Sequence, residues 1–264
     1  MRTWRFLDTG ASTASFNMAL DQAILATHAN GKCLPTLRIY QWSPPAISLG
    51  YFQRRHGIDL AACRRLGIDV IRRSTGGRAV LHFGDLTYSV VAGTADGVPS
   101  SVTAAYSLIC DGLVAGFRAL GFEAELRNLS ARSPRSDICF MTSTAGDILH
   151  EGRKFVGSAQ TWHGSSMLQH GSIIVEPNFW IWMSVQAGKR EPSADWAERL
   201  ESQMTSLREI LGRVPTTGEI GAAMRCGMAR VLGVEVIEGE LSHEESVLAQ
   251  QIMAQQTEEQ LCSR

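Results

Sequence analysis

Short runs of apolar and β-branched residues recur along the chain and are separated by glycine, proline and polar residues. Runs of this length with such boundaries are typical of β-strands. The strands predicted on this basis are Thr3–Leu7, Thr36–Trp42, Ala46–Phe52, Asp69–Arg73, Ala79–His82, Leu86–Val91, Glu123–Leu126, Lys154–Thr161 and Ser166–Val175.

Other stretches place their apolar residues at helical spacing. One predicted helix covers Ser15–Ile24, directly after Ser/Thr-rich residues that are able to cap it. A second covers Val102–Leu120, and Gly121 is a suitable stop for it. Because strands and helices do not strictly alternate, we expect an α+β fold with a mixed, largely antiparallel sheet flanked by helices.

A change in character marks a boundary near residue 187. The segment Ala187–Ser193 combines glycine, proline and charged residues, as linkers do. Charged amphipathic helices are predicted beyond it, around residues 194–211, 217–232 and 242–260. We therefore expect a main domain over residues 1–186 and a small helical C-terminal region over residues 187–264.

The overall composition narrows the class of protein. The chain has 264 residues, 44% of them hydrophobic, and its 25 basic and 26 acidic residues give a net charge of -1. This balance gives no reason to expect nucleic-acid binding. The N-terminal apolar cluster is too short for a signal peptide, and Phe179–Val185 is too short to span a membrane. Six cysteines lack metal-ligand spacing. We expect a cytoplasmic protein with free thiols and no membrane contact.

Lysine is rare in this chain. Only Lys32, Lys154 and Lys189 are lysines among 25 basic residues. Lysine is a compact donor that is able to lose its proton when it is desolvated, unlike arginine. Lys154 stands where a turn enters an apolar strand of small residues, so its amine is expected to point into a pocket. An exposed lysine after a β-turn is an equally plausible interpretation.

The segment RRSTGGRAVLH, residues 72–82, joins two predicted strands through a Gly-Gly pair. A loop of this kind wraps a ligand and offers backbone N–H groups in a locally positive field. Its spacing fits neither a P-loop nor a dinucleotide-binding fingerprint. The alternative is a glycine hairpin flanked by solvated arginines.

Further candidates lie in the second half of the main domain. An apolar strand is interrupted by His170, Gly171 and Ser172, which suggests that backbone atoms contact a ligand there. A buried histidine with no ligand is the commoner case. Cys139 precedes Lys154 by fifteen residues. An ammonium close to a thiol lowers its pKa and makes the thiolate available as a nucleophile. The remaining cysteines are interpreted as inert core residues, and they are Cys33, Cys63, Cys110, Cys226 and Cys262.

The order of these segments resembles the lipoate-protein ligase and octanoyltransferase superfamily. The resemblance covers roughly residues 1–185 and rests on Asn17–Asp21, RRSTGGRAVLH, DLTYSV (85–90), the Cys139-Phe140 pair, GRKFVGSAQ (152–160) and LQHGSI (168–173). The Gly-Gly loop and the Cys-Phe pair are most similar to the cysteine-dependent octanoyltransferases of lipoyl assembly. The resemblance implies a catalytic acyltransferase domain shared in fold with biotin-protein ligases, with an acyl tunnel.

The same resemblance implies roles for individual residues. Cys139 matches the acyl-accepting cysteine, and Lys154 matches a lysine that contacts the acyl carbonyl. The residues implied to form the walls of the acyl site are Arg73, Thr75, Gly76, Gly77, Arg78, Ala79, Val80, Leu81, His82, Gly157, Ser158, Ala159, His170, Gly171 and Ser172.

The expected reaction is a two-step transfer of octanoyl from acyl carrier protein to Cys139, then to a lysine of a lipoyl-domain protein such as glycine-cleavage H protein. This chemistry requires no metal or redox cofactor. An ATP-dependent lipoate-protein ligase, which uses ATP and Mg²⁺, is the nearest rival, since Gly146-Asp147-Ile148 and Arg72-Arg73 also suit a nucleotide site. Two further hypotheses are octanoyl transfer between lipoyl proteins and a catalytically silent binding module.

Overall fold

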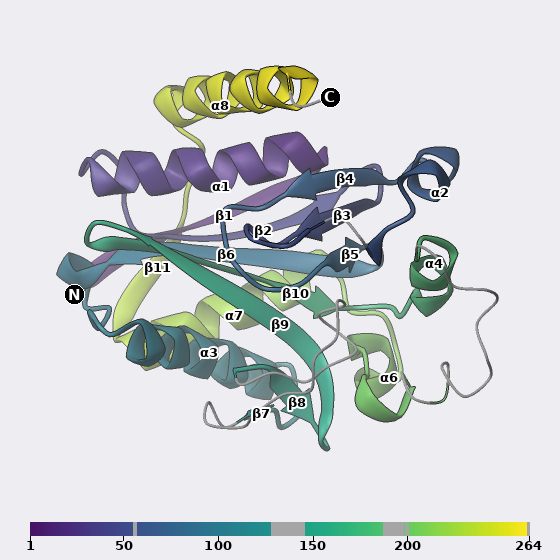
Figure 1. Cartoon of the computed structure of the whole chain (residues 1–264). Coiled ribbons are helices and arrows are strands. Elements are labelled where there is room, and N and C mark those ends of the chain that lie inside the picture. Colours follow the sequence, from purple (N-terminus) through teal and green to yellow (C-terminus); the bar gives the residue numbers. More distant parts are fainter. Residues whose placement is uncertain (55–56, 128–145, 187–197, 199–200, 263–264) are drawn as a thin grey trace.

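A large mixed sheet forms the centre of the molecule (Figure 1). The computed structural model describes the chain except residues 55–56, 128–145, 187–197, 199–200 and 263–264. The strands lie in the order β11 (Val234–Glu238), β1 (Arg2–Ser12), β2 (Thr36–Trp42), β6 (Asp85–Gly93), β10 (Ser166–Ile174), β9 (Arg153–His163), β8 (Ile148–His150) and β7 (Glu125–Leu126). β1 runs parallel to β11 and β2, and every other neighbouring pair is antiparallel. The expected mixed, largely antiparallel sheet is confirmed.

Helices cover both faces of this sheet (Figure 1). α1 (Ala14–Ala29) and α8 (His243–Cys262) lie on one face, and α3 (Val102–Ala119) and α7 (Thr217–Leu232) lie on the other. All residues of β6 are buried, because this central strand has helices above and below it. The main core lies between the sheet and the pair α3 and α7, where Phe117 and Phe155 pack edge to face. The sheet therefore carries the site on strands that are fixed from both sides.

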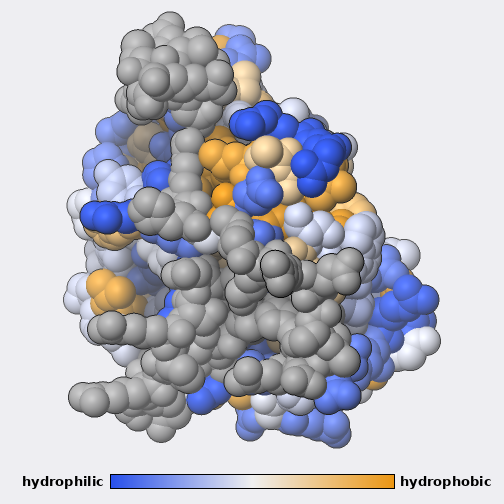
Figure 2. Space-filling model, turned by 45° about the vertical axis from the view of Figure 1, so that its right-hand side comes forward, coloured by the Kyte–Doolittle hydropathy of each residue, from blue (hydrophilic) through white to orange (hydrophobic). Residues whose placement is uncertain are grey.

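A second sheet of three strands lies beside the first. Its order is β4 (Asp69–Arg72), β3 (Ala46–Leu49) and β5 (Val80–His82). α2 (Leu60–Arg65) and α4 (Phe179–Ser184) pack against it, and Ile181 and Trp182 are buried among its apolar residues. Seen from the side of α2 and α4, the surface carries an apolar area bordered by polar residues (Figure 2). The large exposed apolar side chains in the segments around this sheet are Tyr51, Phe52, Leu66, Phe83 and Trp180.

The strand predictions hold for the segments named from the sequence, with shifts of a few residues at their ends. The apolar run at Phe179–Val185 forms α4, a short helix whose apolar residues cover the small sheet. Strands β8 and β11 and helix α2 were not predicted, because each is too short to show a period. Among the described residues, no helix is long and apolar enough to cross a membrane.

The residues after the expected boundary at 187 pack closely on the main sheet. A Cβ atom on Gly227 of α7 would lie 2.2 Å from the carbonyl oxygen of Gly112 of α3, so these helices meet backbone to backbone. Arg5 of β1 forms a buried ion pair with Glu245 of α8. β11 extends the sheet beside β1, so the C-terminal region contains a strand as well as helices. A division of the chain at residue 186 stays a prediction, and the boundary segment itself lies outside the described residues.

Candidate active site

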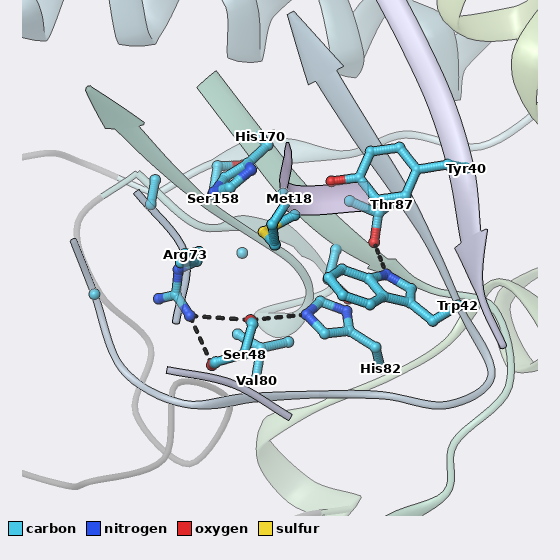
Figure 3. Close-up of a pocket in the computed structure, with 15 residues that line it drawn as sticks. Met18, Tyr40, Trp42, Ser48, Arg73, Val80, His82, Thr87, Ser158 and His170 are labelled. Carbon is cyan, nitrogen blue, oxygen red and sulfur yellow. Dashed lines mark hydrogen bonds between the residues drawn. The ribbon is translucent and has the colours of Figure 1, made fainter. Parts of the chain in front are cut away.

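A pocket lies between the edge of the small sheet and strands β9 and β10 (Figure 3). Its empty volume is about 420 Å³, including the space that opens to solvent. Volumes of this order hold small organic ligands. The lining residues are Met18, Tyr40, Trp42, Ser48, Arg73, Gly77, Val80, His82, Thr87, Gly157, Ser158, Ala159, His170, Gly171 and Ser172.

The Gly-Gly loop forms one wall and is held in place by Arg73. The buried guanidinium of Arg73 donates to the carbonyl oxygens of Ser48, Gly76 and Arg78, each at 2.8 Å. Gly77 has a φ of 91°, and a Cβ atom on Gly50 would lie 1.9 Å from the Gly77 carbonyl oxygen. Glycine is therefore required at both positions. Arg73, for which a solvated position was one interpretation, is instead a buried part of the wall.

The sheet register brings two predicted segments together as the floor of the pocket. In the antiparallel pair β9 and β10, Gly171 lies opposite Ser158, and Ser172 lies opposite Gly157. A Cβ atom on Gly171 would lie 2.6 Å from the Ser158 hydroxyl oxygen and 2.7 Å from the Gly157 carbonyl oxygen. The small residues of both segments thus leave space above the floor. The hydroxyl of Ser158 is hydrogen-bonded to that of Tyr88 at 2.6 Å.

Lys154 is buried beneath this floor. Its side chain is 1% exposed, and its Nζ lies 2.9 Å from Oδ1 of Asp147 in an ion pair. A Cβ atom on Gly157 would lie 3.1 Å from Nζ of Lys154, so the amine approaches the backbone of a pocket-lining residue. The amine is buried, as predicted, but Lys154 does not itself line the pocket. Asp147, which belongs to a segment that the sequence analysis related to a nucleotide site, is its partner.

His170 belongs to a buried network that begins on α1. Its Nδ1 lies 3.1 Å from Oδ2 of Asp21, and its Nε2 lies 2.6 Å from the hydroxyl of Thr75. Asp21 also accepts from Nη1 of Arg38 at 2.7 Å and from the Tyr40 hydroxyl at 2.8 Å. Burial lowers the pKa of His170, although Asp21 works in the opposite direction. Burial opposes ionisation of Asp21, but Arg38 and His170 hold the pKa of this carboxyl below its usual value.

His82 belongs to a second network on the opposite wall (Figure 3). Its Nδ1 lies 2.8 Å from Oδ2 of Asp85, and its Nε2 lies 2.8 Å from the hydroxyl of Ser48. The Ser48 hydroxyl also accepts from Nη1 of Arg73 at 3.1 Å. The ring stacks on Trp42 with centroids 3.9 Å apart and planes 13° apart. The imidazole is therefore fixed in position and orientation.

Most of the predicted wall residues line the pocket. Thr75, Gly76, Arg78, Ala79 and Leu81 do not; they belong to the same loop and strand and lie behind its surface. Five lining residues were not predicted, and they are Met18, Tyr40, Trp42, Ser48 and Thr87. Met18 and Thr87 lie within motifs that the sequence singled out, so those motifs carried the signal. Tyr40, Trp42 and Ser48 lie on strands whose facing only the fold defines.

Cys139 lies outside the described residues, so its role as the acyl-accepting nucleophile stays a prediction. Cys63 and Cys110 are buried, Cys33 is half-buried, and Cys226 is exposed. Burial raises the pKa of Cys110 to about 12 and also raises the pKa values of Cys33 and Cys63. None of these thiols lines the pocket. The interpretation as core residues holds for Cys63 and Cys110 but is wrong for Cys226, which is exposed on α7.

The fold is α+β, and the pocket is built on its central strands and the edge of the small sheet. Residues 13–229 match the family model described as the lipoyl protein ligase A/B catalytic domain, and the chain belongs to this family. The match continues past residue 186 into α7.

Among its relatives are two bacterial proteins named octanoyltransferase LipM. The chain is 41% identical over 266 residues to the protein of Kyrpidia tusciae, with 96% of each chain covered. It is 36% identical over 256 residues to that of Bacillus subtilis, with 92% of this chain and 91% of the relative covered. Lipoate-protein ligase A bound with ATP has a similar fold, with a TM-score of 0.78, 24% identity, and coverage of 96% of this chain and 95% of the other.

Proposed function

We propose that this protein is an octanoyltransferase of lipoyl assembly, which carries an octanoyl group through a cysteine thioester to a lysine of a lipoyl-domain protein. The observation that carries the proposal is the identity of 36–41% to octanoyltransferases over nearly the whole chain. The pocket supports it, since its wall and floor are built from the Gly-Gly loop and the segments 157–159 and 170–172.

In the first step the Cys139 thiolate attacks the octanoyl thioester of an acyl carrier protein. A C–S bond forms, and the carrier leaves as its thiolate. Lys154, as the ammonium partner of Asp147, supplies positive charge beneath the floor at Gly157. Such a fixed charge stabilises the oxyanion that develops on the acyl carbonyl.

In the second step an acceptor lysine attacks the acyl-cysteine and leaves with the octanoyl group as an amide. The exchange between thioesters is nearly isoenergetic, and amide formation from a thioester is downhill, so the reaction needs no ATP. The pocket also suits an apolar chain, since burial of each CH₂ contributes roughly 0.8 kcal/mol. Acyl carrier protein is the proposed donor, and glycine-cleavage H protein is an example of the acceptor. The exposed Tyr51 and Phe52, which follow β3 near the pocket, offer such proteins an apolar contact.

The arginine doublet does not favour the ATP-dependent reaction. Nη1 of Arg72 donates to the carbonyl oxygens of Gly50, Tyr51 and Gln53, at 2.7, 2.8 and 2.8 Å. Arg73 donates to carbonyl oxygens of the Gly-Gly loop in the same way. Arg72 thus stabilises the segment after β3, and Arg73 stabilises the Gly-Gly loop. These internal contacts account for both guanidiniums without a bound phosphate.

The energy source separates the two reactions experimentally. We expect wild-type protein to modify a lipoyl domain with octanoyl carrier protein in the absence of ATP, and not with free lipoate plus ATP and Mg²⁺. Intact mass of the lipoyl domain is the measurement, with Cys139→Ala as the inactive control. Modification that depends on ATP and survives Cys139→Ala would establish the ligase instead.

Lys154→Arg tests the oxyanion contact in the same assay. Arginine keeps the charge but is longer and carries its donors in a rigid planar fork, so the charge takes a different position relative to Gly157. We expect turnover to fall at least about tenfold, as for the loss of part of an oxyanion-type contact. Circular dichroism checks that the variant is folded. Near-normal turnover would show that the amine does not contact the reacting group.

A further inference from the structure

The proposed reaction leaves one proton without an assigned acceptor. When the acceptor lysine attacks the acyl-cysteine as a neutral amine, its nitrogen becomes positively charged and must lose a proton for the amide to form. Lys154 is engaged as the ammonium of an ion pair with Asp147. An ammonium has no lone pair and cannot accept this proton.

Two histidines line the pocket, and each stands between an aspartate and a hydroxyl. Hydrogen-bonded chains of this kind allow a histidine to accept a proton while the carboxylate stabilises the resulting imidazolium. Only the fold brings both chains to one pocket, because their members come from α1, β3, β5, β6, β10 and the Gly-Gly loop.

The charge around the two aspartates differs. Asp21 already forms an ion pair with Arg38, so its charge is offset before His170 is protonated. Asp85 accepts from the hydroxyls of Ser172 and Thr87, at 2.7 and 3.3 Å. Within the described residues, His82 is the only group that forms an ion pair with Asp85. A proton on His82 is therefore stabilised by a carboxylate that no described arginine or lysine neutralises.

Both histidines line the pocket, but only one of their hydroxyl partners does. Ser48 lines the pocket, so the chain through His82 opens on the space where the substrate would lie. Thr75 is fully buried and does not line the pocket, so the chain through His170 is closed at that end. In addition, the Trp42 ring stacked on His82 stabilises a positive imidazolium through its π face.

We infer that Ser48, His82 and Asp85 form the proton relay for the second half-reaction, in which the acceptor lysine is acylated. This inference rests on the proposed function. The carbon–nitrogen bond forms as the amine attacks, and the nitrogen passes a proton to Ser48 Oγ. The Ser48 proton moves in turn to His82 Nε2. The carbon–sulfur bond then breaks with its electron pair on sulfur. The departing sulfur remains as the thiolate with which the first step began, and His82 releases its proton to solvent through Ser48, which restores the enzyme.

The two half-reactions provide the test, because only the second removes a proton from an amine. In the first measurement, enzyme and octanoyl carrier protein are mixed without acceptor, and acyl-enzyme is followed by intact mass after rapid quenching. In the second, purified acyl-enzyme is mixed with a lipoyl domain, and the octanoylated domain is followed over time. The variants are Ser48→Ala, His82→Gln and Asp85→Asn. His163→Gln, at an exposed position near the end of β9, is the matched control.

We expect His82→Gln to slow the second half-reaction about a hundredfold, within the usual range for loss of an acid–base group. Ser48→Ala should slow it about tenfold, because a water molecule takes the place of the hydroxyl less effectively. The first half-reaction should change less than about threefold in both variants, and His163→Gln should change neither.

A pH profile of the second half-reaction separates a relay from a structural role. The charged or titratable groups that face His82 are Asp85 beside it, Arg73 beyond Ser48, and His170 across the pocket. In wild type the rate should rise with pH through an inflection that is missing in His82→Gln. Asp85→Asn should shift this inflection to lower pH, since the imidazolium loses its counter-ion.

Several outcomes would overturn the inference. Equal slowing of both half-reactions by His82→Gln would indicate a structural role, and unchanged rates would indicate no role. An octanoyl ester on Ser48 would make this hydroxyl a nucleophile instead. If His82→Gln fails to fold, Ser48→Ala gives the same test with a smaller change. Failure of the proposed function is distinguishable, because wild type would then form no acyl-enzyme at all.

Discussion

The networks around His170 and His82 contain the same types of group but differ in how charge is balanced. The Asp21 network includes Arg38 and the Tyr40 hydroxyl, so its charges are paired within the core. The Asp85 network is completed by hydroxyls and by His82, and it reaches the pocket through Ser48. We therefore expect the first arrangement to act mainly on stability, while the inferred relay uses the second.

The largest expected effect comes from removing the cation of the first network. Arg38→Met leaves the buried Asp21 carboxylate without its ion-pair partner, which costs about 3–5 kcal/mol of unfolding free energy. Urea denaturation followed by circular dichroism measures this loss. Arg118→Met is the matched control, because its pair with Glu123 is exposed on both sides. The control should leave the unfolding midpoint unchanged. Equal losses of unfolding free energy in both variants would show that the Arg38 pair contributes no more than an exposed pair.

The pH dependence of stability sharpens the comparison further. Because burial lowers the pKa of His170 in the folded protein, the unfolded chain takes up a proton at this residue at a higher pH than the folded chain does. Its stabilising contribution is complete above about pH 6.5 and is lost as the pH falls toward the folded-state value. The lowered pKa of Asp21 acts in the same direction at lower pH, below its ordinary 3.8.

We therefore expect the melting temperature of wild type to fall between about pH 7.5 and pH 5. In His170→Asn part of this fall should be absent, because the histidine proton no longer distinguishes the two states. Differential scanning calorimetry across this range is the measurement, with His163→Gln as an exposed-histidine control. A slope identical to that of wild type in His170→Asn would show that another group carries the dependence.

The smallest expected effect concerns the ring that orients His82. Trp42→Phe keeps an aromatic face against the imidazole but removes the indole N–H that donates to the Thr87 hydroxyl at 2.7 Å. Loss of one such hydrogen bond costs about 1 kcal/mol of unfolding free energy. Chemical denaturation gives the free energy of unfolding of this variant, of Thr87→Val and of the double variant. If the two losses add in the double variant, the hydrogen bond contributes nothing by itself.

The sequence determined the positions of the main strands and the order of the motifs. Apolar periodicity is a local property of the sequence, so it can be recognised without knowledge of the fold. The scarcity of lysine singled out Lys154, and a buried ion pair with Asp147 accounts for it. Short elements such as β8, β11 and α2 were not predicted, because a few residues are too short a stretch to show a hydrophobic period.

Only the tertiary structure decided which groups meet at the pocket. Asp21 and His170 are 149 residues apart, and their contact depends on the packing of α1 on the sheet. Ser48 and His82 meet across the small sheet, where neither residue shows a signal in its own segment that points to the other. A single sequence records which side chains a segment carries, but the register of paired strands determines which of them face each other. For that reason the sequence supplied the chemistry of this site, and the fold decided how its two histidines differ. Among the described residues, the aspartate beside His82 has no other ion-pair partner, and the hydroxyl beside His82 lines the pocket.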